Sequence, residues 1–193
     1  MARIPYVDHD DLDSADQALL DSSSPPEDLD EAYRHLMSTR TRNSYRTIGH
    51  FPNVLRSYRE LVEAIKRDSG LTIAEQEYVI LRCAREIPSR YEWHNHVRIA
   101  LNAGVEADAI RAIADRATDD FAPKHSALLS YVDAFLDGTV DDEAHAALAE
   151  HYDDSTIAGV CLFAGYWLMN ARVVDALGVE IEEPFVGWNL ENV

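Results

Sequence analysis

The stretch LTIAEQEYVILRCAREIPSRYEWHNHVRIALNAGV, residues 71–105, decides the fold of this chain. Thr72 and Glu75 have the spacing of a capping box, which indicates that a helix begins here. Pro88 interrupts the helical pattern, and Gly104 ends the helix that follows it. The stretch therefore predicts two consecutive helices joined by a short turn.

The same helical periodicity continues through most of the remaining sequence. Sustained alternation of polar and apolar residues, which is typical of strands, is nearly absent, and no internal repeat is found. The sequence therefore predicts an all-α helical bundle of seven to nine helices with short connections. Besides the two helices within 71–105, the expected helices cover residues 27–40, 51–70, 106–115, 122–138, 141–152 and 154–178.

The chain is expected to contain one domain with two short extensions. A length of 193 residues suits a single domain that buries a sizeable core. Residues 1–27 are acidic and rich in Ser and Pro, which predicts a partly extended arm with at most one or two helical turns. Residues 28–182 are expected to form the helical domain, and residues 183–193 an extended tail.

The composition is strongly acidic, with a formal net charge of −18 and only two lysines, Lys66 and Lys124. Such a surface repels nucleic acid and anionic lipid, so we expect neither as a partner. Acidic, lysine-poor surfaces suit a cytoplasm with molar salt, where charge repulsion is screened within a few ångströms. An ordinary acidic cytosolic protein is the alternative interpretation.

The apolar run at residues 157–169 is shorter than the roughly 20 residues needed to span a bilayer, and it contains Gly159 and Gly165. It is expected to form a buried helix. The N-terminal sequence lacks an apolar signal core, which predicts a cytoplasmic protein. Cys83 and Cys161 lie in separate apolar runs and form no CxxC, so we expect two buried thiols and no dithiol or structural zinc site.

Polar residues stand on the apolar faces of the two central helices. Glu77 shares a face with Leu81 and Ala84, while Glu92 and His96 lie one turn apart on the next helix. A buried carboxylate must be paired, hydrogen-bonded or protonated. If the two helices fold back on each other, the two glutamates and the histidine converge in one pocket, as an acid/base group with two carboxylates to tune it.

Simpler interpretations stand beside this one. Ser89 and Glu92 also have capping-box spacing, and His96 could be a hydrogen-bonded core or interface histidine. His94 points to the other side of the helix, so the two histidines make a poor metal pair. A Glu/Glu/His metal site lacks a known ligand motif, and we expect no metal and no cofactor.

The pattern at Glu77, His96, Ala100 and Gly104 resembles that of the carboxymuconolactone decarboxylase family, which includes the AhpD-like alkylhydroperoxidases. The likeness covers about residues 40–182. It implies an AhpD-like helical bundle that assembles as a homo-oligomer, commonly a dimer, trimer or hexamer.

The resemblance also separates two branches of that family. The peroxidase branch carries CxxCxxxH, and alignment on His96 puts Ser89 and Glu92 at the two cysteine positions. A serine and a glutamate cannot perform dithiol chemistry. The chain is therefore more similar to the branch without the cysteine pair, which implies cofactor-free decarboxylation or a related lyase reaction on a small carboxylated lactone or unsaturated acid.

In that interpretation His96 transfers the proton, Glu77 orients it and Glu92 hydrogen-bonds nearby. Tyr91 and Trp93 either contact the substrate or only pack at the helix entry. A separate set of basic residues could hold the substrate carboxylate, and its candidates are Arg82, Arg85 and Arg98. The alternative to an enzyme is a non-catalytic helical oligomer or ligand-binding scaffold.

Overall fold

The computed structural model describes residues 1–21 and 41–182, and its regular structure there is helical apart from one isolated β-bridge between Asp21 and Thr41. Eight α-helices in this part of the chain confirm the predicted all-α class. The α-helices are α2 (Asn43–Ile48), α3 (Pro52–Asp68), α4 (Ile73–Glu86), α5 (Arg90–Asn102), α6 (Ala107–Ala114), α7 (Pro123–Asp137), α8 (Asp142–Ala149) and α9 (Asp154–Leu177). Three short 3₁₀ helices are η1 (His9–Asp11), η2 (Gln17–Leu20) and η3 (Thr118–Asp120).

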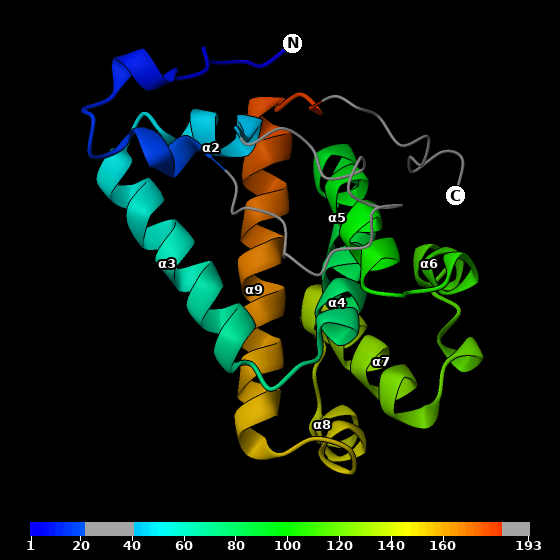
Figure 1. The fold of residues 1–193 in the computed structure, drawn as a ribbon. Helices are drawn as coiled ribbons and strands as arrows, with labels where there is room; N and C mark the ends of the chain where they lie inside the picture. Colours follow the sequence, from blue (N-terminus) through cyan, green and yellow to red (C-terminus); the bar gives the residue numbers. More distant parts are fainter. Residues whose placement is uncertain (22–40, 183–193) are drawn as a thin grey trace.

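Helix α9 runs through the middle of the molecule, with α3 on one side and α4 and α5 on the other (Figure 1). Helix α4 packs against α5, α6, α7 and α9, so it is central as well. Helices α4 and α5 pack closely across a turn of three residues, 87–89, as the sequence predicted. This arrangement turns Glu92 and His96 of α5 toward α9.

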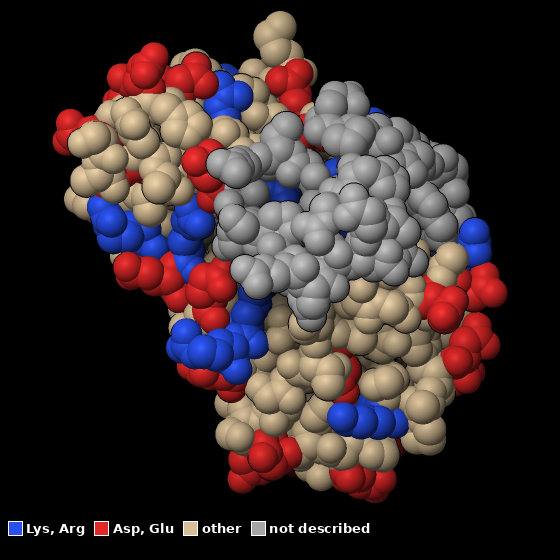
Figure 2. All heavy atoms as spheres, viewed as in Figure 1, with Lys and Arg blue, Asp and Glu red and all other residues tan. Residues whose placement is uncertain are grey.

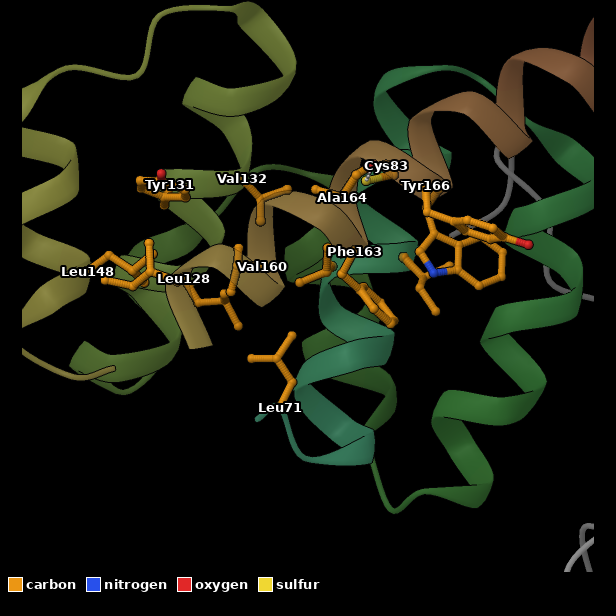
Figure 3. Close-up of a cluster of buried hydrophobic side chains, with 14 of the residues drawn as sticks. Leu71, Cys83, Leu128, Tyr131, Val132, Leu148, Val160, Phe163, Ala164 and Tyr166 are labelled. Atoms are coloured by element: carbon orange, nitrogen blue, oxygen red, sulfur yellow. Dashed lines mark hydrogen bonds between the residues drawn. The ribbon is translucent and has the colours of Figure 1, made fainter. Parts of the chain in front are cut away.

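Two apolar clusters form the core. The first surrounds α9 and joins it to α4, α7 and α8 (Figure 3). Its members include Leu71, Cys83, Leu128, Val132, Leu148, Val160, Phe163, Ala164 and Tyr166. The second lies between α4, α5 and α6 and includes Leu81, Trp93, Val97, Ile110 and Ile113. Burial of these side chains, at about 25 cal/mol per Å² of apolar surface, supplies the main driving force for packing the helices.

Helix α9 is longer than the apolar run suggested. It extends from a cap at Asp153, whose side chain accepts the Thr156 N–H, to Gly178, which takes the left-handed conformation that glycine adopts without strain. It confirms the helix predicted at 154–178, and its 24 residues are long and apolar enough to cross a membrane, although the apolar run at 157–169 alone is not. However, 56% of its apolar window is buried inside the protein. Helix α9 is therefore the core helix of a soluble helical protein.

The N-terminal residues form η1 and η2, and the Arg3 N–H donates to the Leu177 carbonyl at the end of α9. The predicted helix at 27–40 and the predicted tail at 183–193 lie outside the described residues. The expected domain boundaries therefore stay predictions. Acidic side chains are spread over the face shown in Figure 2, with basic side chains between them. No single acidic patch dominates that face.

Candidate active site

Helices α4 and α5 bring Glu77, Glu92 and His96 together. The His96 Nδ1 lies 2.8 Å from Glu77 Oε2, and its Nε2 lies 3.6 Å from Glu92 Oε2. Each of the three side chains is at most 6% exposed. One buried imidazole thus stands between two carboxyl groups, one from each helix, and this is the convergence that the sequence pattern predicted.

The capping alternative for Glu92 is realised only in part. Ser89 caps α5 by accepting the Glu92 N–H at 3.4 Å, but the Ser89 N–H donates to the Ala84 carbonyl and not to the Glu92 side chain. The Glu92 carboxyl group instead turns inward, where Asn170 Nδ2 of α9 donates to its Oε1 at 2.8 Å. Its other oxygen faces His96.

Two further helices extend this cluster with residues that the sequence analysis did not select. The Tyr58 hydroxyl of α3 donates to Asn170 Oδ1, so a chain of polar contacts runs from α3 to Glu92. The Trp167 ring of α9 stands edge-on to His96, with centroids 4.4 Å apart. Its indole N–H has no hydrogen-bond acceptor among the described residues. In the sequence of α9, the sign of these residues was that Trp167 and Asn170 carry hydrogen-bonding groups within an otherwise apolar stretch.

Burial dominates the electrostatics of Glu92. It raises the pKa of this carboxyl group to about 8, against the opposing influence of Arg42 and Lys66 and with the support of Glu182 and Glu77. Glu92 is therefore mostly protonated at pH 7. A neutral carboxylic acid next to an imidazole can donate a proton, which an ionised carboxylate cannot.

The other predicted site residues of α5 lie elsewhere. The Tyr91 hydroxyl is on the neighbouring face of the helix, 2.7 Å from Glu182 Oε1 and 3.1 Å from Ser44 Oγ. Trp93 packs in the apolar cluster between α4, α5 and α6, apart from His96. His94 is fully buried, and burial together with Arg98 and Arg42 lowers its pKa to about 4, so it is neutral at pH 7.

Two of the arginines considered as substrate-binding groups have structural roles. Arg82 donates to the Ile113 carbonyl at 2.6 Å, and Arg85 donates to the Ala114 carbonyl at 2.9 Å. Both bonds attach α4 to the end of α6. Arg98 remains as a candidate, and it donates to Asn95 Oδ1 at 2.6 Å.

The two thiols lie on separate helices. Cys83 of α4 is buried, its S–H donates to the Ala164 carbonyl at 3.8 Å, and burial raises its pKa well above the ordinary value. Cys161 of α9 is only partly buried, which corrects the expectation of two buried thiols. Its sulfur lies 3.4 Å from the Tyr131 hydroxyl. Within the described part of the chain, no group of three or more His, Cys, Asp or Glu residues has an arrangement that could hold a metal ion.

Two surface hollows of the described residues lie away from the imidazole. One, of about 510 Å³, lies between α7 and α8 and is lined by residues such as Ser126, Tyr131 and His151. Another, of about 500 Å³, lies over α3 and η2 and includes Arg56 and Glu63. Neither is lined by Glu77, Glu92 or His96.

Comparisons with known proteins agree with this architecture. The sequence profile described as the carboxymuconolactone decarboxylase family matches residues 52–134, which include Glu77, Glu92 and His96. The sequence matches none of the curated proteins at a significant level.

Three solved structures illustrate the likeness of fold. An uncharacterised peroxidase-related protein with an alkylhydroperoxidase AhpD core, from Ralstonia eutropha, has a TM-score of 0.68 at 18% identity, covering 85% of this chain and 93% of that one. A protein of unknown function from Agrobacterium tumefaciens, provisionally named as the antioxidant defence protein AhpD, has a TM-score of 0.66 at 18% identity, covering 72% and 97%. The debrominase Bmp8 has a TM-score of 0.66 at 16% identity, covering 74% and 78%.

At these identities the solved structures define the fold, while the family profile spans the two helices that carry the buried imidazole and both carboxyl groups. Residues 52–134 thus match the carboxymuconolactone decarboxylase family, and the described part of the chain has the AhpD-like fold.

Proposed function

We propose that the protein catalyses proton transfer without a cofactor, in a decarboxylation or related lyase reaction on a small carboxylated lactone or unsaturated acid. The observation that carries this proposal is the His96 imidazole between an acceptor carboxylate, Glu77, and a carboxyl group that burial keeps protonated, Glu92. Such a group stores a proton at neutral pH close to a base that can pass it on.

The proposed reaction proceeds in two steps. The bond between the substrate carbon and its carboxylate breaks, CO₂ leaves, and the electron pair is delocalised into the conjugated carbonyl group. His96 Nε2 takes a proton from the Glu92 carboxyl group and delivers it to that carbon, and Glu92 is then reprotonated from water. Glu77 holds the ring by accepting from Nδ1. The 3.6 Å separation between Nε2 and Glu92 Oε2 shortens when substrate closes the site, as catalytic contacts often do.

The buried indole N–H of Trp167 supports a polar ligand beside His96. Buried donors are nearly always paired, and this one has no acceptor among the described residues. A carbonyl or carboxylate oxygen of the substrate would satisfy it. The ring that carries this donor stands edge-on to the imidazole, with centroids 4.4 Å apart.

The test is turnover of a panel of small carboxylated lactones and unsaturated acids, followed by CO₂ release. We expect wild-type activity on at least one compound and a loss of about 10²-fold or more in His96→Gln and Glu92→Gln. Glu75→Gln is the matched control. Glu75, on α4, is a buried glutamate like Glu92, but it contacts Lys124 and Tyr152 instead of His96. Equal rates in all variants that remain folded would exclude the proposed site.

The alternative is a ligand-binding scaffold without chemistry, and the closed surroundings of His96 favour it. Binding of a lactone acid without CO₂ release, at every pH between 5 and 9, would support that alternative. A redox function is a distant third, since the chain has no CxxC and we place it with the branch lacking that pair. Unchanged turnover after Cys83→Ser and Cys161→Ser would separate the reaction from the thiols.

We also propose that the protein acts as a homo-oligomer in a salt-rich cytoplasm, with no nucleic-acid or membrane partner. Apolar side chains are exposed on two neighbouring helices, namely Val54 and Leu61 on α3 and Leu162 and Met169 on α9. A neighbouring copy would cover them. Sedimentation at molar salt should give dimers, trimers or hexamers, and monomers at micromolar concentration would contradict this.

A further inference from the structure

The two lysines of this acidic chain have different partners. The Lys124 ammonium lies over the Tyr152 ring, 4.6 Å from its centroid, and forms an ion pair with Glu75 at 2.8 Å. The Lys66 ammonium of α3 lies over the Trp167 ring of α9, 5.9 Å from its centroid. No ion pair joins Lys66 to a carboxylate of the described residues, although the chain contains 35 acidic residues. Within this part of the chain, Lys66 therefore lacks the carboxylate partner that Lys124 has.

The end of α3 is attached to α4, which fixes the position of Lys66. The Gln76 side chain of α4 donates from Nε2 to the Lys66 carbonyl at 2.9 Å and to the Leu71 carbonyl at 3.0 Å. Gln76 directly precedes Glu77, which lies against the imidazole. Lys66 is itself only half-buried, so a ligand in solution can reach it.

Trp167 connects this ammonium with the candidate active site. One side of the connection is the edge-on contact of its ring with His96, at 4.4 Å between centroids, and the other is the Lys66 ammonium over the same ring. The indole N–H is buried and has no acceptor among the described residues. Burial raises the pKa of Glu92, and Lys66 is one of the cations that oppose this effect. A positive charge and a buried donor therefore accompany the two groups proposed to move the proton.

The chemistry of CO₂ loss determines which substrate oxygen such donors can stabilise. The leaving carboxylate begins as an anion and ends as neutral CO₂, so a cation bound to it stabilises the ground state and slows the reaction. The electron pair of the broken bond moves into the conjugated carbonyl group, whose oxygen becomes an enolate oxygen. A cation and an N–H donor at that oxygen stabilise the charge as it develops. Lys66 and Trp167 therefore suit the carbonyl oxygen and not the leaving carboxylate.

We propose that the Lys66 ammonium and the Trp167 indole N–H bind the carbonyl oxygen of the substrate and stabilise the enolate that forms there when CO₂ leaves. The assignment rests on the proposed function, because it names the groups that stabilise the charge in that reaction. Protonation of carbon by His96 Nε2 then uses the electron pair for the new C–H bond and restores the carbonyl group. The site therefore binds planar molecules that carry a conjugated anionic oxygen, such as enolates and phenolates.

The experiment measures binding of para-nitrophenol and of its neutral methyl ether, para-nitroanisole, to the full chain at neutral pH. Para-nitrophenol titrates near neutral pH and is yellow only as the phenolate, so its colour reports which form is bound. We expect the wild type to bind the phenolate at least about 10-fold more tightly than Lys66→Met does, because the variant loses a charge-assisted hydrogen bond. Para-nitroanisole should bind equally to both proteins.

Arg67→Met is the matched control, since Arg67 is the neighbouring cation of α3, is exposed and pairs with Asp68. It removes the same charge, and phenolate binding should stay close to that of the wild type because exposed charges are screened. Lys66→Arg keeps the charge and should retain most of the affinity. Trp167→Phe is a second variant that removes the N–H but keeps an aromatic ring, and it should also weaken phenolate binding. Melting temperatures identify the variants that are folded.

Equal phenolate affinity in the wild type and in folded Lys66→Met would overturn the proposal. Binding of para-nitrophenol as the neutral phenol, or no binding to the wild type, would overturn it as well. An equal loss of affinity for para-nitroanisole would show that Lys66 only packs against Trp167.

Turnover separates this inference from the proposed function. On any compound that the wild type decarboxylates, Lys66→Met should lower kcat by about 10²-fold with little change in KM, because the charge develops only after binding. A raised KM with unchanged kcat would place Lys66 at the leaving carboxylate and contradict the assignment. Phenolate binding that depends on Lys66 stands even if no lactone acid is decarboxylated. Decarboxylation that needs Glu92 but not Lys66 would support the proposed function and exclude this site.

Discussion

Two helices in this protein begin with the same Ser/Thr-x-x-Glu signature, but the carboxyl groups of the two glutamates differ in protonation. At α4, Thr72 and Glu75 form a complete capping box, in which the Thr72 N–H donates to Glu75 Oε2 at 2.9 Å. At α5, Ser89 caps the helix, but the Glu92 side chain turns away from the cap toward His96. Both glutamates are almost fully buried.

The difference comes from the donors around each carboxyl group. Burial raises the pKa of Glu75, but Lys124, Tyr152 and Thr72 together lower it to about 2. Glu92 accepts from the neutral amide of Asn170, and burial raises its pKa to about 8. At pH 7 one glutamate is therefore an anion that holds the fold together, and the other is an acid able to release a proton.

The largest expected effect of this difference is on turnover. Glu92→Gln removes the proton store and should lower kcat by about 10²-fold or more on any compound that the wild type decarboxylates. Glu75→Gln should change kcat by less than about 10-fold, since it leaves the imidazole cluster intact. Steady-state rates measured on folded protein decide the matter. Similar losses in both variants would mean that the two glutamates do not differ in role.

The next effect is on the pH dependence of stability. Glu92 has a higher pKa in the folded state, about 8, than the ordinary value of 4.5, so its contribution is favourable below pH 4.5 and is lost as pH rises to 8. The wild type should therefore lose stability relative to Glu92→Gln across that window, with a slope of up to about 1.4 kcal/mol per pH unit. Urea unfolding at pH 5, 6.5 and 8 measures it.

Glu75 should behave in the opposite way. Its folded pKa is about 2, so its stabilising contribution is present above pH 4.5 and is lost as pH falls toward 2. Relative to Glu75→Gln, the wild type should therefore lose stability only in acid. Coincident pH windows for the two glutamates would contradict the assigned protonation states.

The sequence predicted the parts of this arrangement that depend on helical period. Glu77 stands at the same spacing as the core residues Leu81 and Ala84, and it is buried with them. The break at Pro88 predicted that α4 and α5 would fold back on each other. Because the two helices pair in this way, Glu77 of α4 comes close to His96 of α5. The box of Thr72 and Glu75 was also predicted correctly, because its members are only three residues apart.

The state of Glu92 could not be decided from its own helix, because the spacing of Ser89 and Glu92 fits both a cap and an inward-facing acid. The deciding group, Asn170, comes from α9, 78 residues further along the chain. Arg42 and Glu182 likewise reach α5 from distant segments, across separations that no local pattern encodes. Tertiary contacts, not propensity, thus determined which interpretation held.

At pH 7 the direct effect of Glu75 on stability should be of intermediate size. Glu75→Gln replaces an anion that accepts from Thr72, Tyr152 and Lys124, the last at 2.8 Å, by a neutral amide. Loss of charge-assisted hydrogen bonds of this kind costs roughly 1.5–3 kcal/mol. Glu92→Gln should change stability by less than about 1 kcal/mol at acidic pH, because glutamine has the shape of the protonated acid. Thermal unfolding of both variants tests the contrast.

The smallest effect concerns the caps themselves. Thr72→Ala removes the Oγ that accepts the Glu75 N–H and donates to its carboxylate at 2.8 Å, and should cost about 1–2 kcal/mol. Ser89→Ala removes one long cap bond of 3.4 Å and should cost about 0.5–1 kcal/mol. Because the Glu92 side chain is not part of that cap, Ser89→Ala should leave the pH profile of turnover unchanged. A shifted profile in Ser89→Ala would mean that the cap, and not the interior, sets the protonation of Glu92.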